Sequence, residues 1–249
     1  MLLVVDVESY IFRACTACKT LINVPGYSPD TKANPNIYVE AYDIRRGMDY
    51  IASFIEDLKA KFLTNDVILV VGDQNNWRKQ YCPDYKANRR DKEKPPMYDI
   101  ILNELYNNYE VVSLPNLEAD DTCRIIYEDN KNYATRKLLI SIDKDFHSFP
   151  CELYDPLHDK QYVVNEVDAN YNLMKQIIMG DKADNIQGLE GYGEVKTTKF
   201  LEDEPRTLED VKQLFKEKGQ LKDFNINLNL VSMVSLNRYD FNTGKVKVL

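Results

Sequence analysis

Residues 2–6 read LLVVD, and two later stretches repeat this pattern, VILVVGD at 67–73 and KLLISID at 137–143. Each stretch is a continuous apolar run, rich in β-branched residues, that ends in an aspartate. Short runs of this kind are typical of strands buried on both faces. The three stretches therefore predict three strands at the centre of a sheet, each with an acid at its carboxyl end.

Helical patterns separate these strands. Apolar residues spaced by three and four predict a helix over 38–62, and further helices are expected near 97–106 and 118–128, with a short strand near 110–114. Strands that alternate with helices are typical of an α/β fold whose parallel sheet is flanked by helices. After about residue 165 the pattern becomes helical, near 167–180, 194–201, 208–218 and 228–236, around a glycine-rich stretch at 180–193.

The three strand-end acids are Asp6, Asp73 and Asp143. Ligands of parallel α/β sheets bind beyond the carboxyl ends of the strands. A single aspartate there is also explained as a helix N-cap or a turn residue. Three acids at three equivalent ends favour a shared site instead.

Six further acids extend this group. Three stand in EADD at 118–121, where complementing the helix dipole is the alternative explanation. Asp143 and Asp145 alternate along an extended segment and so share a face, and Asp181 and Asp184 have helical-turn spacing. The nine acids are Asp6, Asp73, Glu118, Asp120, Asp121, Asp143, Asp145, Asp181 and Asp184. Hard oxygen ligands favour Mg²⁺ or Mn²⁺, and their number predicts two ions about 4 Å apart, suited to phosphodiester hydrolysis.

Residues 77–94 form a basic segment inside an acidic chain. The segment holds seven Lys or Arg and three acids, a net +4, whereas the whole chain carries −8. Aromatic residues interleave with the basic ones, which favours contact with a nucleic-acid strand. A solvated charged loop is the alternative explanation.

Other chemistries are disfavoured. His147 and His158 are the only histidines and stand in no nucleophile or zinc motif, and no Walker A motif is present. Cys15 and Cys18 form one CxxC among five cysteines, without a second pair for a four-thiolate zinc site. No apolar run reaches the roughly 20 residues of a membrane span, and no signal peptide is recognisable. A cytosolic location is expected, the host cytoplasm if the protein is viral.

The motifs, taken in order, resemble the 5′-nucleases, the superfamily of flap endonucleases and 5′→3′ exonucleases. Six stretches carry the likeness: DQNNWRK at 73–79, PDYKANR at 83–89, EADD at 118–121, SIDKDF at 141–146, GDKADN at 180–185 and GLEGYG at 188–193. Order and spacing hold from residue 3 to about 201. The motifs NWRK and YKANR, together with RYDF at 238–241, most resemble those of the exonucleases of short-tailed bacteriophages.

This resemblance implies a fold and a division of the chain. It implies a PIN-like nuclease domain at 1–165 with a helical arch at about 76–96. It also implies a helical region at 166–249 with a helix–three-turn–helix clamp for duplex DNA. The first metal site would use Asp6, Asp73, Glu118, Asp120 and Asp121, and the second Asp143, Asp145, Asp181 and Asp184.

Further roles follow from the same resemblance. Lys86 would polarise the scissile phosphate, acting with Asp73, Asp121 and Asp143 as the catalytic set, and Tyr85 is its aromatic neighbour. The residues expected to contact DNA are Arg13, Arg78, Tyr85, Lys86, Arg89, Arg90, Gly188, Gly191, Gly193, Lys196 and Thr197.

The function implied is a Mg²⁺- or Mn²⁺-dependent 5′→3′ exonuclease that hydrolyses duplex DNA, with RNA of RNA–DNA hybrids as a further substrate. A structure-specific flap endonuclease is the main alternative, and a non-catalytic DNA-binding relative or a PIN-type toxin ribonuclease are others. Val7 stands where the family usually has glycine, and Glu8 adds an acid. These departures concern substrate preference more than the chemistry.

Overall fold

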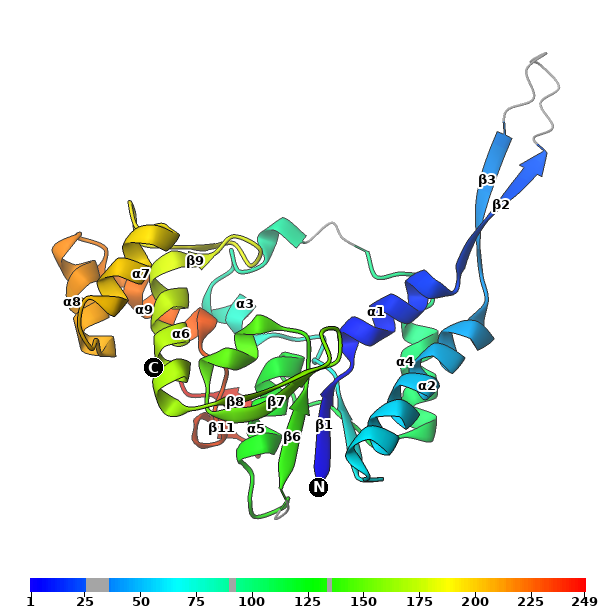
Figure 1. The fold of residues 1–249 in the computed structure, drawn as a ribbon. Coiled ribbons are helices and arrows are strands. Elements are labelled where there is room, and N and C mark those ends of the chain that lie inside the picture. The colour runs from blue at the N-terminus through cyan, green and yellow to red at the C-terminus, as the bar shows by residue number, and fades with distance from the viewer. Residues whose placement is uncertain (26–35, 90–92, 134–135) are drawn as a thin grey trace.

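A six-stranded sheet lies at the centre of the computed structural model, which describes residues 1–25, 36–89, 93–133 and 136–249 (Figure 1). The strand order is β5-β4-β1-β6-β7-β8. Neighbouring strands from β5 to β7 run parallel, and β8 pairs antiparallel with β7 at the edge. The predicted α/β fold with a parallel sheet flanked by helices is confirmed.

The elements have the following bounds. The strands are β1 Leu2–Asp6, β2 Lys19–Pro25, β3 Asn36–Tyr42, β4 Val67–Val70, β5 Val111–Val112, β6 Lys137–Ile140, β7 Cys151–Asp155, β8 Lys160–Val164, β9 Gly180–Asp181, β10 Ile186–Gln187, β11 Tyr239–Asp240 and β12 Lys245–Val246. The α-helices are α1 Glu8–Ala17, α2 Ile44–Phe62, α3 Trp77–Tyr81, α4 Tyr98–Asn108, α5 Ala119–Glu128, α6 Glu166–Met179, α7 Glu194–Glu202, α8 Leu208–Glu217 and α9 Leu221–Val231. Short 3₁₀ turns are η1 Ala87–Arg89, η2 Lys144–Ser148 and η3 Leu236–Arg238.

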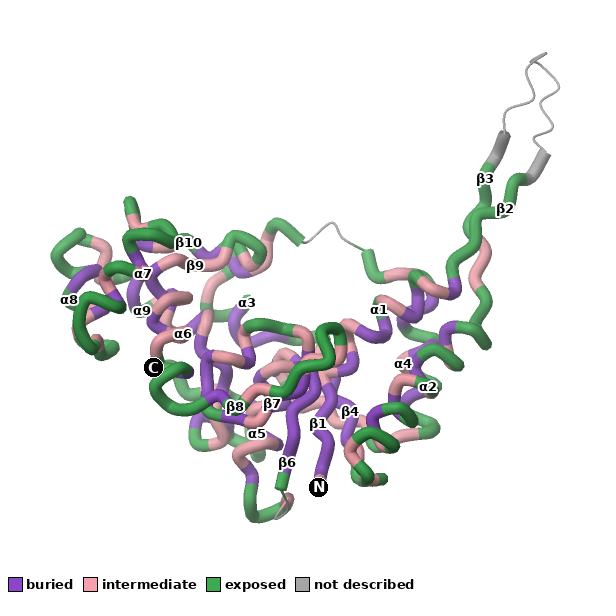
Figure 2. Tube along the Cα trace, viewed as in Figure 1, coloured by how far each residue is buried: buried purple, intermediate pink, exposed green. Residues whose placement is uncertain are grey.

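Strands β1, β4 and β6 are buried along both faces, as their continuous apolar runs predict (Figure 2). Alternate side chains enter two cores: Val5 packs with α1, α2 and α4, while Val4 packs with α5. The register pairs Asp6 with Val70, and Val5 with Ile140. The carboxyl ends of the three central strands therefore lie at one edge of the sheet.

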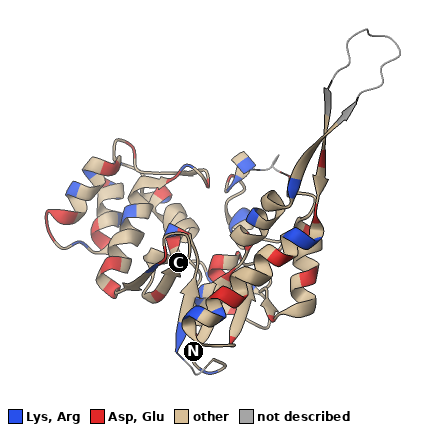
Figure 3. Cartoon of the chain, turned by 45° about the vertical axis from the view of Figure 1, so that its right-hand side comes forward, with Lys and Arg blue, Asp and Glu red and all other residues tan. Residues whose placement is uncertain are grey.

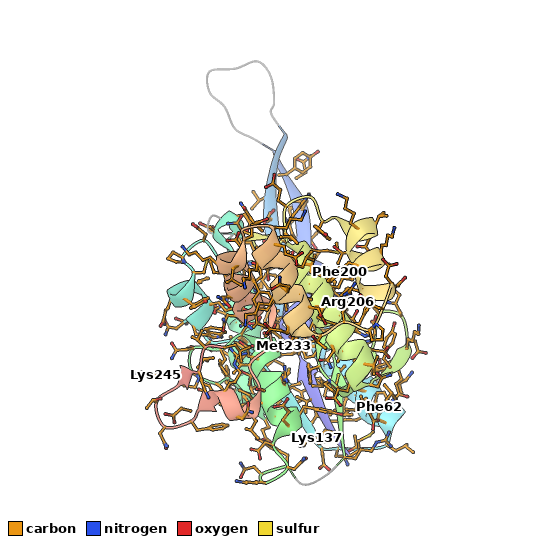
Figure 4. All side chains as sticks on the ribbon, turned by 90° about the vertical axis from the view of Figure 1, so that its left-hand side faces the viewer. Phe62, Lys137, Phe200, Arg206, Met233 and Lys245 are labelled. Atoms are coloured by element: carbon orange, nitrogen blue, oxygen red, sulfur yellow. The ribbon has the colours of Figure 1, made fainter. Side chains whose placement is uncertain are left out.

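The chain after residue 165 forms the predicted helical region, on the left in Figure 1. Helices α6, α7, α8 and α9 enclose a small core of their own that includes Ile177, Val211 and Phe215. In Figure 4 the labelled Phe200 and Arg206 lie close together, and the guanidinium carbon of Arg206 is 4.5 Å from the ring centre of Phe200. Met233 packs into the core of the first region. The boundary near 165 stays a prediction.

The hairpin of β2 and β3 corrects one expectation. Residues 38–42 were assigned to the start of the long helix, but they form β3, and the helix begins at Ile44. The side chain of Asp43 accepts a hydrogen bond from the backbone N–H of Arg46, which fixes that start. The hairpin extends from the end of α1, and its described side chains at 19–23 and 38–40 are exposed (Figure 2).

Three other segments differ from expectation. Strands β7 and β8 were not predicted, and α9 spans Leu221–Val231 instead of 228–236. The described parts of the expected helical arch form two short helices, α3 and η1, separated by turns. Arg90 lies outside the described residues. None of the described helices is long and apolar enough to cross a membrane.

Candidate active site

Asp6, Asp143 and Asp145 gather at the carboxyl edge of the sheet, and Ser141 connects two of them. The Ser141 hydroxyl donates to Oδ2 of Asp6 at 3.0 Å and accepts from the backbone N–H of Asp143 at 3.1 Å. Oδ1 of Asp143 accepts from the backbone N–H of Asp145 at 2.9 Å. From α6, Gln176 Nε2 donates to Oδ1 of Asp145 at 2.6 Å. The edge therefore holds three carboxylates in defined orientations.

Burial and repulsion from neighbouring acids raise the pKa of Asp6, Asp145 and Asp120. Burial first, and then the charge of Glu8, raise the pKa of Asp6 to about 7. Burial and the charge of Asp143 raise the pKa of Asp145 to about 6. Burial and Asp121 raise the pKa of Asp120 as well. Within the described part of the chain no Lys or Arg pairs with Asp6, Asp120 or Asp145, so a cation would relieve their repulsion.

Asp121 is separated from this group, which corrects its assignment as a metal ligand and catalytic residue. It is fully buried on α5, and Arg78 Nη2 donates to its Oδ1 at 2.8 Å. The backbone N–H of Val234 donates to the same oxygen at 2.7 Å, while Arg78 Nη1 and Trp77 Nε1 donate to Oδ2. Because both oxygens are occupied inside the protein, Asp121 is unavailable to an ion.

Arg78 was expected to line the path of a DNA strand, and this expectation is wrong. The side chain is about 1% exposed and lies among Asp121, Glu118 and two backbone carbonyls. A basic residue in a charged segment normally faces water. Here α3 turns it inward, because Glu118 and Asp121 compensate its charge.

Glu118 precedes α5 and receives donors from the basic segment. Arg78 Nη1 donates to its Oε2 at 3.2 Å, the Tyr85 hydroxyl donates to the same oxygen at 2.8 Å, and Lys86 Nζ bonds to Oε1. Burial alone would raise the pKa of Glu118, but Arg78 and Lys86 outweigh it and hold the pKa below its usual range. Glu118 is therefore ionised and firmly held.

Tyr85 was expected to contact DNA, but its ring is buried inside this arrangement. No face of the ring is exposed for stacking on a base. The residue is about 3% exposed and packs against Ile186 and Leu230. Burial and the charge of Glu118 raise the pKa of Tyr85. The hydroxyl thus stays protonated and acts as a donor to Glu118.

Asp184 joins the basic segment to the turn between β9 and β10. Arg89 Nη2 donates to its Oδ1 at 2.6 Å, and Lys86 Nζ lies 3.7 Å from Oδ2. The backbone N–H of Lys86 donates to the Asp184 carbonyl at 2.8 Å, and Asn88 Nδ2 reaches two further carbonyls of the turn. Asp181 faces Lys144 at 3.7 Å. Residues 84–89 therefore dock on the turn at 182–185.

Asp73 contributes to the local turn. Its Oδ2 accepts from the backbone N–H of Asn116 at 2.7 Å and its Oδ1 from that of Gln74 at 2.8 Å. It also lines a groove of about 900 Å³ between the start of α3 and α4. Exposed Lys79, Lys94 and Tyr106 border the same groove.

The donor chemistry of the remaining acids fits a hard divalent cation. Asp6, Asp120, Asp143 and Asp145 offer carboxylate oxygens without an ion-pair partner, and burial followed by neighbouring acids raises the pKa of Asp6, Asp120 and Asp145. Among the described residues, however, no three acidic, His or Cys side chains form a ready metal cage. The residue types therefore fit, while binding requires local adjustment of the side chains.

The glycine-rich turn follows α6. A Cβ on Gly188 would lie 2.2 Å from the carbonyl oxygen of Met179, so only glycine fits against the end of α6. Gly191 has φ +77°, the left-handed region that favours glycine. Gly193 is exposed, and a Cβ added there would meet no atom within 4 Å. Lys196 is exposed, but Thr197 is fully buried and cannot contact DNA as expected.

Two residues of the site were missed from the sequence, Ser141 and Gln176. Ser141 stands two residues before Asp143, on the same face of an extended segment, which was a usable signal. Gln176 has no such signal, because only the packing of α6 brings it to Asp145.

Arg13 and the cysteines of the CxxC were also singled out in the sequence. Arg13 on α1 lies with its guanidinium carbon 5.6 Å from the ring centre of Tyr10. Cys15 and Cys18 are buried free thiols, and burial raises the pKa of Cys15 to about 11, in keeping with a packing role. Charges of both signs are interspersed over the chain (Figure 3).

Comparison with known proteins gives consistent matches. A family model described as 5′-3′ exonuclease, N-terminal resolvase-like domain, matches residues 1–172. The chain is 33% identical over 181 residues to an exonuclease of Escherichia phage T7 and 32% identical over 180 residues to an exodeoxyribonuclease of Enterobacteria phage T3. Each match covers 69% of this chain and 59% of the relative, so the chain spans less than two thirds of their length.

A solved structure of the T5 5′-exonuclease with bound zinc ions has a similar fold. The TM-score is 0.66 at 18% identity, and the alignment covers 92% of this chain and 88% of the other. The likeness extends beyond residue 172 and so includes most of the helical region.

Proposed function

The chain belongs to the 5′-3′ exonuclease family, and we propose that it is a divalent-metal-dependent nuclease that hydrolyses duplex DNA from 5′ ends. The membership confirms the resemblance found in the motifs. The observation that carries the proposal is the group of carboxylates Asp6, Asp143 and Asp145 at the carboxyl edge of the sheet, which hydrogen bonds through Ser141 hold together. Asp120 lines a small cavity together with Asp145. RNA in RNA–DNA hybrids is proposed as a second substrate.

Two Mg²⁺ or Mn²⁺ ions held by these acids would supply Lewis-acid stabilisation and a water nucleophile at neutral pH. The glycine-rich turn would bind duplex phosphates through the exposed backbone at Gly193 and through Lys196, since a helix N-terminus follows. Lys86 lies between Glu118 and Asp184. It would exchange these carboxylates for an oxygen of the scissile phosphate.

The function is tested with a 5′-labelled blunt duplex, a matched RNA–DNA hybrid and a duplex with an unpaired 5′ flap, each in Mg²⁺, Mn²⁺ and EDTA. We expect Mg²⁺-dependent release of mono- or dinucleotides from the blunt duplex. Binding without cleavage in either metal would contradict the proposal and support a non-catalytic relative.

A flap endonuclease is the second candidate, and the groove of about 900 Å³ favours it. The volume of the groove is near the upper limit for small-molecule pockets. Lys79 and Lys94 at its border suit the phosphates of an unpaired strand. A single long product from the flap substrate, with the blunt duplex untouched, would assign the chain to this second activity.

Changing Lys86 to alanine should lower kcat by about 100-fold with KM changed by less than about threefold. The proposed contact strengthens as charge develops on the phosphate, so turnover suffers more than binding. Steady-state kinetics at saturating Mg²⁺ measures both constants. Lys212→Ala, which removes a half-buried lysine of α8 that pairs with Glu209, is the matched control and should change neither. Equal losses in kcat and affinity for Lys86→Ala would contradict the role.

A further inference from the structure

Arg78 joins three parts of the chain that are distant in sequence. Its Nε donates to the carbonyl of Leu230 at 2.8 Å and its Nη2 to the carbonyl of Ser232 at 3.0 Å. The two Nη atoms also hold both oxygens of Asp121. One guanidinium thus connects the start of the basic segment, helix α5 and the end of α9.

The surroundings of this pair leave little freedom. Arg78 is about 1% exposed and Asp121 is fully buried. A buried ion pair is stable only when its remaining donors and acceptors are also satisfied, and here two carbonyls and the backbone N–H of Val234 do so. The planar group of arginine matches this set of acceptors, whereas an ammonium would reach only part of it.

The same guanidinium orients Glu118. Nη1 donates to Oε2 of Glu118, and the Tyr85 hydroxyl donates to that oxygen as well. A carboxylate with one oxygen held by two donors presents its other oxygen in a fixed direction. That other oxygen, Oε1, binds Lys86. The location of the Lys86 ammonium therefore depends on Arg78 through Glu118.

We propose that Arg78 is a positioning residue, which fixes the orientation of the Glu118 carboxylate and thereby the position of the Lys86 ammonium. Because Arg78 is itself held by the carbonyls of Leu230 and Ser232, this arrangement depends on the C-terminal segment 230–234. The importance of Lys86 for cleavage rests on the proposed function. The contacts themselves concern the protein without metal or DNA.

The first experiment measures the reactivity of Lys86 in the metal-free protein. Arg78→Lys keeps the charge that Asp121 requires but loses donors to Glu118 and the carbonyls. An amine-reactive ester, followed by peptide mass spectrometry, should label Lys86 at least about threefold faster in this variant, relative to exposed Lys79. Unchanged labelling of Lys86 in a folded variant would overturn the proposal.

The second experiment is a kinetic double-mutant cycle. Arg78→Lys should lower kcat by about tenfold in the wild-type background and by less than about twofold in the Lys86→Ala background, because both changes act through one group. Losses that multiply would refute the positioning role. Absence of cleavage by the wild type would instead remove the proposed function, and the labelling result would still decide the position of Lys86.

Two further variants separate positioning from stability. Arg238 is also buried, lies over the Trp77 ring and donates to the carbonyl of Lys247. Arg238→Lys should therefore lower stability without changing the labelling of Lys86. If Arg78→Lys does not fold, the combined change Arg78→Met with Asp121→Leu replaces the pair by apolar side chains. It should raise the labelling of Lys86 in the same way, and unchanged labelling would again contradict the proposal.

Discussion

Replacing Asp143 by asparagine should lower kcat by about 1000-fold and leave DNA affinity in Ca²⁺ within about threefold of the wild type. The change removes one charge and retains an acceptor for the backbone N–H of Asp145. Because Asp143 is exposed at the edge of the sheet, its carboxylate is accessible to an ion. Single-turnover cleavage and fluorescence anisotropy measure the two quantities.

The same substitution should slightly stabilise the metal-free protein. The charge of Asp143 contributes to the raised pKa of both Asp6 and Asp145. Removing it relieves repulsion at a site strained for function, and we expect the free energy of unfolding in EDTA to rise by about 0.5 kcal/mol. Loss of activity together with increased stability distinguishes a metal ligand from a residue that supports the fold.

Asp43→Asn is the matched control for this prediction. Asp43 also accepts a backbone N–H, from Arg46 at the start of α2, but is not one of the nine acids predicted to bind metal. Its asparagine variant should keep full activity. Cleavage by Asp143→Asn at the wild-type rate would remove Asp143 from the site.

The central strands could be predicted because their signal is local. An apolar run such as Leu2–Val5 has few alternatives once it ends in an acid and a helical pattern follows. Residues 38–42 show the limit of this reasoning. Tyr38 and Ala41 continue the three-and-four spacing of α2, so periodicity assigned them to the helix, whereas pairing with Lys19–Pro25 makes them a strand. Local spacing carries no information about that partner.

The candidate site likewise contains some residues that the sequence predicts and others that it does not. The strand-end acids Asp6 and Asp143 follow from topology, because parallel strands place their carboxyl ends together. Arg78 does not follow, since its partner Asp121 stands 43 residues later and its carbonyl acceptors lie at 230 and 232. A basic segment was expected to face DNA, and only the packing of α9 shows that part of it is internal.

Changing Gly188 to alanine should lower the free energy of unfolding by about 3 kcal/mol. The added methyl would lie 2.2 Å from the carbonyl oxygen of Met179 and 2.7 Å from that of Ile178. The latter oxygen accepts the backbone N–H of Leu189, so the turn cannot move away without losing this bond. Chemical denaturation measures the loss, and a change of less than about 1 kcal/mol would contradict the packing argument.

Gly193→Ala separates packing from DNA contact within the same turn. No atom lies within 4 Å of its added methyl, and the φ of −87° is ordinary, so stability should fall by only about 0.5 kcal/mol through the weaker N-cap of α7. The methyl would nevertheless stand where a phosphate approaches the helix N-terminus, and duplex affinity should fall about threefold or more. Unchanged affinity in this folded variant would place the DNA elsewhere. The two variants therefore test different claims. Gly188→Ala tests whether close packing maintains the turn, and Gly193→Ala tests whether the turn binds DNA.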